Sequence, residues 1–176
     1  MRKPASMRAL EDLGRVRLSE NFFFRDFLHS EIADFYGLPN IPEKPDLAIE
    51  NGRRLCEDLP EPLQRSFGRL AIRSGYRAQT VTAFGHGRRL CGSVAGNAGY
   101  HIWDIPDDKG NRGAAACVVI PWFADRFAAG ADWRALAWWI HDHLDYSHLE
   151  FYPKLAAFNI LWSEEPEWIE SEIWYP

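Results

Sequence analysis

Four stretches of the chain have the polar and apolar pattern of β-strands. Residues 70–74 alternate between apolar and polar side chains and end at Gly75, where the chain is expected to turn. Residues 114–120 form a run of small and apolar residues, which is typical of a buried strand. The same pattern predicts two later strands, at residues 148–152 and 158–162. These four segments predict a β-sheet.

Helices are predicted where apolar residues recur at helical spacing, at residues 25–36, 46–59, 124–129 and 132–144. Gly37 suits the left-handed position that ends the first of them. Asp132 is expected to cap the last, because its carboxylate can accept from the free amides of a first helical turn. Helices and strands together predict an α+β fold.

The chain divides by charge into a central domain and two ends. Residues 1–17 carry five Lys or Arg against two acids, and we expect a mobile or partner-ordered basic arm. Residues 18–162 are long enough to bury a core of their own. Residues 163–176 carry five glutamates and no basic residue, but also Trp168, Ile169, Ile173 and Trp174, so this acidic aromatic tail is expected to pack somewhere.

Composition limits the classes of function. The net charge of −5 argues against a general nucleic-acid binder, which needs a basic face to neutralise phosphates. Arg2 and Lys3 are not followed by an apolar segment, so no signal peptide is expected, and no apolar run is long enough for a membrane span. Three cysteines without framework spacing fit a reducing compartment, such as the bacterial cytoplasm.

Candidate chemistry concentrates between residues 73 and 117. The segment begins with Ser74-Gly75-Tyr76-Arg77, continues through a glycine-rich loop over residues 85–99, and reaches Tyr100-His101-Ile102-Trp103-Asp104. It ends on the small-residue strand Gly113-Ala114-Ala115-Ala116-Cys117. A polar strand end, a histidine beside aromatic residues and a strand of small residues predict one wall of a site.

These pieces, in this order, resemble the zinc D-Ala-D-Ala carboxypeptidase family, which includes peptidoglycan metallopeptidases and shares its fold with the Hedgehog signalling domain. The resemblance covers residues 18–162 and implies an α+β fold with helices packed on a central antiparallel sheet. It implies a zinc ion held by two histidines and one aspartate, with a water that the metal acidifies and a carboxylate deprotonates. It also implies that Arg77 holds substrate or the developing oxyanion and that His101 is the first zinc ligand.

Two of the implied ligand positions carry other residues. The position four residues after Gly113, where the family has aspartate, is Cys117. The late-strand position of the second histidine is Asn159, and eleven residues separate His101 from Gly113. A neutral amide is a poor zinc ligand, and cysteine differs from aspartate in softness. Zinc is therefore expected only if other residues replace the lost ligands.

Several residues are candidates for the missing roles, and each also has a structural interpretation. Asp104, Asp107 and Asp108 lie between His101 and Gly113, although Asp107 and Asp108 also fit a solvated turn. Nitrogen ligands are available at His141, His143 and His148, but the first two do not share a helix face. Glu150 or Glu164 could act as the base or lie solvated at a strand edge.

The structural interpretation extends to the implied site itself. His101 fits a hydrogen-bonded structural histidine, and Cys117 fits a buried thiol. Arg77 is expected to have a buried carboxylate partner whether or not the site is active. None of these interpretations is decided by the sequence.

The sequence favours a non-catalytic descendant of this peptidase fold. More loosely, the chain resembles head-spike or capsid-associated base proteins of phage-like particles and gene transfer agents, which implies protein subunits as partners and residence in such a particle. One alternative is an active zinc peptidase that uses Arg77 and Glu150 on peptidoglycan peptides. Another is a non-catalytic module that binds cell wall or polysaccharide.

Overall fold

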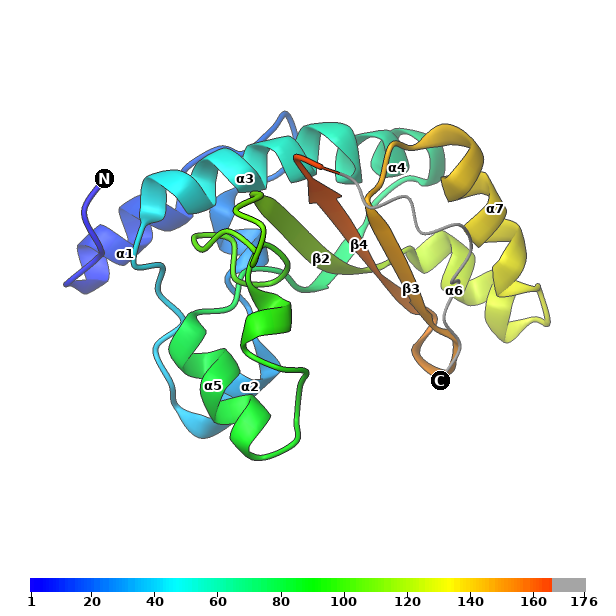
Figure 1. Ribbon diagram of the computed structural model, residues 1–176. Coiled ribbons are helices and arrows are strands. Elements are labelled where there is room, and N and C mark those ends of the chain that lie inside the picture. The colour runs from blue at the N-terminus through cyan, green and yellow to red at the C-terminus, as the bar shows by residue number, and fades with distance from the viewer. Residues whose placement is uncertain (166–176) are drawn as a thin grey trace.

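The computed structural model describes residues 1–165 and has an α+β architecture built on one sheet (Figure 1). Its strands are β1 (Ala71–Ser74), β2 (Gly113–Val119), β3 (His148–Tyr152) and β4 (Ala157–Ser163). They lie in the order β1-β2-β4-β3, and every neighbouring pair is antiparallel. The predicted α+β class, the antiparallel sheet and the four predicted strands are confirmed.

The two faces of the sheet carry different side chains. Along β4, Phe158, Ile160 and Trp162 are buried on one face. The residues between them, Asn159 and Leu161, point to the other face and line a cavity. Because side chains alternate along a strand, this pattern assigns one face to the hydrophobic core and the other to a candidate site.

Four helices cover the core face: α3 (Pro45–Asp58), α4 (Pro60–Phe67), α6 (Pro121–Ala128) and α7 (Trp133–His143). From α3, the Arg54 guanidinium lies 5.5 Å from the Trp162 ring centroid. From α7, the Trp133 ring lies 5.0 Å from that of Phe151, centroid to centroid. Asp132 caps α7 by accepting from the Arg134 amide, as predicted.

The helices α2 (Glu31–Tyr36) and α5 (Gln79–Gly87) form a lobe that projects from the sheet on the side away from α6 and α7 (Figure 1). Gly37 ends α2 with a φ of 64°, which confirms its predicted left-handed role. The helix predicted over residues 25–36 is interrupted: a 3₁₀ turn, η1 (Phe24–Phe27), precedes α2. The Ser30 hydroxyl accepts from the Ala33 amide and so starts a new helix.

Three α-helices of the described residues were not predicted from the sequence pattern, and two of these are α4 and α5. Pro60, which directly follows the helix predicted over residues 46–59, is the first residue of α4, a position that suits proline because its missing amide would have no partner there. The first part of the glycine-rich segment belongs to α5, and a 3₁₀ turn, η2 (Ala95–Asn97), follows in the loop. Glycine obscured α5 because it lowers helix propensity without preventing a helix.

The first 17 residues do not form the mobile arm that their charge predicted. Helix α1 (Met7–Gly14) lies within them, capped by Ser6, and the Leu13 side chain is fully buried in the core. Lys3 also forms an ion pair with Glu43 on the same domain. The segment packs because the buried leucine adds apolar contact that a charge count does not register.

The tail side chains at Trp168, Ile169, Ile173 and Trp174 lie outside the described residues. Within residues 1–165, no helix is both long enough and apolar enough to cross a membrane.

A buried carboxylate ties the start of the domain to α4. Glu61 is 3% exposed and accepts hydrogen bonds from the Ser19 hydroxyl and from the backbone and side-chain amides of Asn21, each at 2.7 Å. Burial raises the pKa of the Glu61 carboxyl, but the hydrogen bonds from Asn21 and Ser19 outweigh it and hold that pKa below its usual value.

We expect Glu61→Gln to lower the free energy of unfolding by about 1–3 kcal/mol at neutral pH, because an amide cannot accept all three bonds. The folded pKa lies below the unfolded one, so this stabilisation is present above the unfolded value of about 4.3 and is lost on acidification. Urea unfolding at neutral pH and at about pH 3.5 should therefore show the two proteins converging in acid. An equal gap at both pH values would contradict this role of the carboxylate.

Candidate functional site

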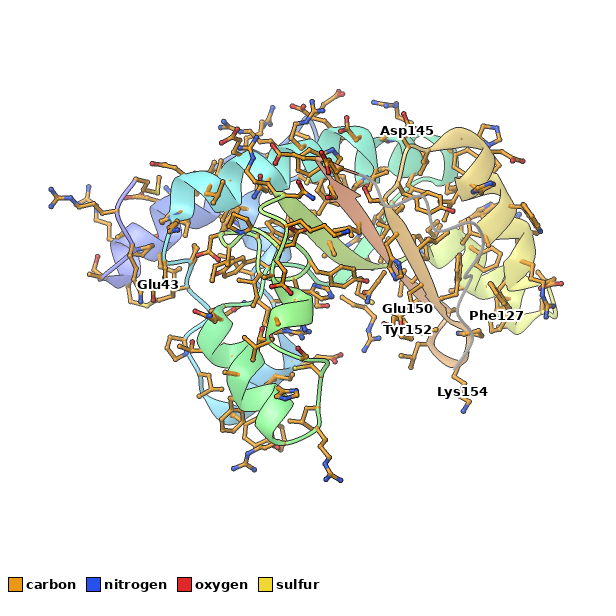
Figure 2. The ribbon with its side chains drawn as sticks, viewed as in Figure 1. Glu43, Phe127, Asp145, Glu150, Tyr152 and Lys154 are labelled. Carbon is orange, nitrogen blue, oxygen red and sulfur yellow. The ribbon has the colours of Figure 1, made fainter. Side chains whose placement is uncertain are left out.

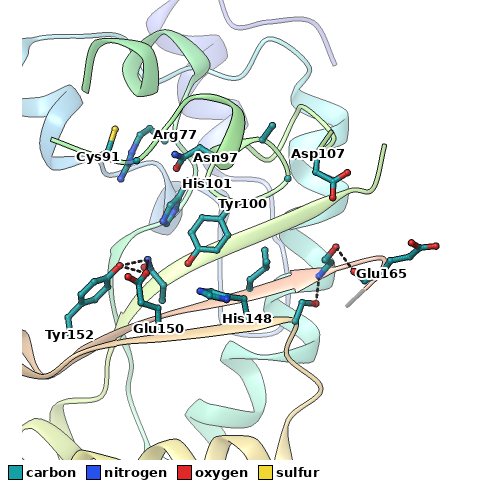
Figure 3. Close-up of a pocket in the computed structure, with 18 of the residues that line it drawn as sticks. Arg77, Cys91, Asn97, Tyr100, His101, Asp107, His148, Glu150, Tyr152 and Glu165 are labelled. Atoms are coloured by element: carbon teal, nitrogen blue, oxygen red, sulfur yellow. Dashed lines mark hydrogen bonds between the residues drawn. The ribbon is translucent and has the colours of Figure 1, made fainter. Parts of the chain in front are cut away.

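A cavity of about 730 Å³ lies on the face of the sheet opposite the core. Residues of β3 and β4 form one side of it, and the segment 90–101 together with Arg77 forms the other. Figure 3 shows Glu150 and Tyr152 at one end, Arg77 and Cys91 across from them, and Glu165 at the far rim. The wall predicted between residues 73 and 117 thus borders a cavity, as the sequence suggested.

Backbone hydrogen bonds hold the loop that carries Tyr100 and His101 against the sheet. The Ala115 amide donates to the Tyr100 carbonyl at 2.8 Å, and the Arg77 amide donates to the His101 carbonyl at the same distance. The loop therefore occupies the edge of β2 where β1 no longer pairs with it. This pairing fixes both side chains at the cavity wall.

The residues between His101 and Gly113 anchor that loop. Trp103 is fully buried, and its indole nitrogen donates to the Ala115 carbonyl at 3.1 Å. Asp104 is also buried and accepts from the Glu43 and Lys44 amides and from the Tyr76 hydroxyl. Asp104 is therefore a structural residue and not the substitute ligand that the sequence left open.

His101 is held by its ring as well as its backbone. Its Nδ1 lies 2.9 Å from the Gly75 carbonyl oxygen, which can only accept, so Nδ1 carries the proton. Burial and the nearby Arg77 guanidinium lower the pKa of His101 to about 3. His101 is therefore neutral at physiological pH, and its structural interpretation is compatible with a place on the cavity wall.

Arg77 lies in the cavity wall without a carboxylate partner. It forms no ion pair with any residue between 1 and 165, and its buried Nε atom has no hydrogen-bond acceptor in that part of the chain. The buried carboxylate partner expected for Arg77 is absent from the described residues, so that expectation was wrong for them. An arginine with a buried free N–H is a strong donor for a bound acceptor or anion.

Tyr100 presents a second free group. Its hydroxyl is buried and faces the Asn159 amide without reaching hydrogen-bonding geometry. Its ring lies 4.8 Å from the His101 ring and 5.8 Å from the His148 ring, between centroids (Figure 3). Burial lowers the pKa of His148, and Glu150 only partly opposes that shift. The middle of the cavity is thus lined by neutral aromatic donors.

Three predicted positions form a row across the sheet. Cys117 pairs with Asn159, and Asn159 pairs with Glu150, in the strand register. The Asn159 side-chain nitrogen donates to the Tyr152 hydroxyl at 2.8 Å and, more weakly, to Glu150 at 3.3 Å. The Tyr152 hydroxyl in turn donates to Glu150, and Figure 2 shows both side chains extending from β3. The amide and the carboxylate are therefore engaged with each other.

Cys117 behaves as the buried thiol of its structural interpretation. Its side chain is 6% exposed. Burial raises the pKa of the Cys117 thiol to about 11, although the neighbouring Arg73 guanidinium favours the thiolate. Arg73 is already paired with Glu31 at 2.6 Å. Without a metal the thiol is therefore protonated at physiological pH, and a metal ion would have to displace that proton in order to bind.

The residues at the implied zinc positions do not suit zinc. His101 keeps one ring nitrogen available, but Cys117 is protonated and Asn159 offers a neutral amide whose nitrogen is a donor. In residues 1–165, no three His, Cys, Asp or Glu side chains are grouped so that they could hold a metal ion. We therefore derive no chemical step through zinc.

Of the acidic residues and histidines considered as replacement ligands, His148 lines the cavity together with His101. The others lie away from this row or serve local structure. Asp107 lines the cavity but accepts from the Lys109 and Asn111 amides, which confirms a turn at this point. The rest of these side chains are exposed Asp108, His141 beside the Tyr146 hydroxyl, His143 stacked on Trp139, and Glu164 paired with Arg112.

Sequence reasoning missed the roles of Tyr100, Tyr152 and Arg73. Tyr100 stands directly before His101, and strand alternation places Tyr152 on the same face as Glu150, so both could have been found. No sequence pattern could have predicted that Arg73 lies near Cys117, because their proximity depends on an irregular register between β1 and β2.

Comparison of the chain with protein-family models, with curated proteins and with solved structures gave no match.

Proposed function

We propose that this chain is a non-catalytic domain of the D-Ala-D-Ala carboxypeptidase type, with a Hedgehog-like sheet, and that it serves as an attachment protein of a phage-like particle. The order of Ser74-Gly75-Tyr76-Arg77, His101 and the small-residue strand supports the fold type. The positions of Arg77 and His101 in one cavity wall are consistent with it.

The observation that carries the non-catalytic role is the row of Cys117, Asn159 and Glu150 beside His101. A peptidase of this type needs anionic or imidazole ligands at the first two positions and a free carboxylate as base. Here the first is a protonated thiol, and the second is an amide that donates to Tyr152 and Glu150. The cavity is retained while the groups that would activate water are not.

The cavity remains suited to holding a ligand. Arg77 and Tyr100 each present a buried polar atom without a partner in the described chain. Such groups cost free energy unless a ligand or water satisfies them, so an acceptor-bearing peptide or glycan would bind there favourably. The looser resemblance and the five basic residues of segment 1–17 support particle attachment, with synthesis in the bacterial cytoplasm and transfer to the particle.

Copurification tests the attachment role. The tagged full chain is expected to sediment with particles from a producing culture, and to remain with them through a density gradient. Zinc-loaded protein is expected to release no D-alanine from peptides ending in D-Ala-D-Ala. Recovery only as free protein, with no particle fraction, would overturn the attachment role.

The active zinc peptidase is the second candidate, which Glu150 favours because its carboxylate lies in the same cavity as His101. One equivalent of tightly bound zinc, removed by His101→Ala, together with D-alanine release, would establish it. A cell-wall or polysaccharide module would instead sediment with sacculi or capsule and release no D-alanine. Both readouts can be measured on the same purified protein.

A further inference from the structure

The lobe of α2 and α5 ends in an exposed cluster that no part of the cavity explains. We call it the aromatic tip and define it by Phe35, Tyr36, Phe84 and Arg88. Phe35 is 82% exposed and Tyr36 36%. Large side chains grouped and exposed in this way are typical of contact surfaces.

The rings of the tip are already arranged in the free chain. The Tyr36 ring centroid lies 4.9 Å from that of Phe35 and 4.8 Å from that of Phe84. The Arg88 guanidinium carbon lies 5.0 Å from the Tyr36 centroid and 4.7 Å from that of Phe84. Such an ordered cluster loses little conformational entropy when a partner binds.

Close packing beneath the tip holds its two helices together. A Cβ atom at Gly85 would lie 2.7 Å from the Cys91 sulfur and 2.9 Å from Ile32 Cδ1. Only glycine allows α5 to approach α2 this closely. The tip is therefore a supported surface and not a loose loop end.

The charges left free on the lobe are positive. The acidic residues of α2 already have partners, because Glu31 pairs with Arg73 and Asp34 with His29. Arg88 and Arg89 are exposed and form no ion pair with any described residue. A partner of this surface is therefore expected to be acidic and to carry large apolar side chains.

The chain itself contains a segment of that chemistry. Residues 163–176 carry five glutamates, no basic residue, and tryptophan, isoleucine and tyrosine side chains. Eleven residues follow Glu165, enough to span about 36 Å when extended. Figure 1 shows the end of β4 beside α3, whereas the α2–α5 lobe projects away from α3.

We propose that the aromatic tip binds the acidic segment 163–176 of a second copy of this chain. The described start of this segment, residues 163–165, lies at the end of β4 and not at the tip. The proposed contact is therefore head-to-tail, and each copy can contribute its tip to one neighbour and its segment to another. Aromatic side chains and Arg88 provide the anchor, and the glutamates provide charge complementarity.

Sedimentation of the full chain between about 1 and about 100 µM tests the proposal. We expect concentration-dependent association that weakens between about 50 and about 500 mM salt. Arg88→Glu and Phe35→Ser should each weaken it by about tenfold or more. Arg53→Glu, an equal charge change at an exposed residue of α3, is the matched control and should leave association unchanged.

A charge exchange makes the test specific. A chain with Glu167, Glu170 and Glu172 changed to Lys should fail to associate with itself but should bind the Arg88→Glu chain when the two are mixed. A wild type that stays monomeric throughout, an Arg53→Glu chain weakened as much as Arg88→Glu, or mixed variants that do not associate would each overturn the proposal. All substituted tip residues are exposed, so folding is expected to be retained.

Discussion

Gly113→Ala is expected to destabilise the protein by more than about 3 kcal/mol and to disorder the candidate site. An added Cβ atom would lie 2.1 Å from the Gly99 carbonyl oxygen and 3.0 Å from that of Trp162. Both atoms belong to the backbone, so no side-chain rotation can relieve the clash. Either the loop after Gly99 or strand β2 must move, and the hydrogen bond from Ala115 to Tyr100 lies directly beside this point.

Urea unfolding followed by circular dichroism measures the loss, and Gly96→Ala is the matched control. A Cβ atom at Gly96 would meet only the Ser93 hydroxyl, at 4.0 Å, and the φ of Gly96 is not positive. The control should change stability by less than about 0.5 kcal/mol. Equal stability of the two variants would show that the backbone at Gly99 does not lie against Gly113 of β2.

A chain carrying both Cys117→Asp and Asn159→His is expected to gain zinc affinity by a factor of about 1,000 or more. The two positions are register partners on β2 and β4, so their side chains leave the sheet on the same face. That face borders the cavity lined by His101, whose second ring nitrogen is available. The substitutions restore two histidines and one carboxylate, the set that the family resemblance implies.

Competition against a fluorescent zinc chelator measures the gain, with metal analysis for stoichiometry. Each single substitution should give much weaker binding, and adding His101→Ala to the pair should abolish it. Loss of the Asn159 hydrogen bonds to Tyr152 and Glu150 should cost about 1–2 kcal/mol of stability, so folding must be checked in parallel. A folded double variant with wild-type zinc affinity would argue against the family fold.

Local sequence patterns were sufficient for most of the regular structure. Alternation located the strand at residues 70–74, and a continuous run of small and apolar residues located the buried strand β2. The local patterns failed where a helix boundary was misjudged. Pro60 starts α4, and Ser30 caps the start of α2 within the helix predicted over residues 25–36. The charge of residues 1–17 predicted a mobile or partner-ordered arm, but this segment packs on the domain because a few of its side chains, such as Leu13, are buried.

The sequence indicated several of the residues that line the cavity but few of the contacts that they make. His101, Arg77, Glu150 and Asn159 do line one cavity. The absence of an ion-pair partner for Arg77 among the described residues, and the free hydroxyl of Tyr100, depend on what approaches from segments far away in the chain. Spacing along the sequence carries no information on such contacts.

The sequence by itself determined the α+β class, the positions of the four strands, and which residue types stand at the ligand positions that the family resemblance implies, since these follow from local order and side-chain chemistry. Only the tertiary structure decided that Cys117, Asn159 and Glu150 form one row, that Asp104 is a buried structural acceptor, and that the α2–α5 lobe ends in the aromatic tip. The physical reason is that strand register, burial and the pairing of charges are set by long-range packing, which brings together residues that no local pattern connects.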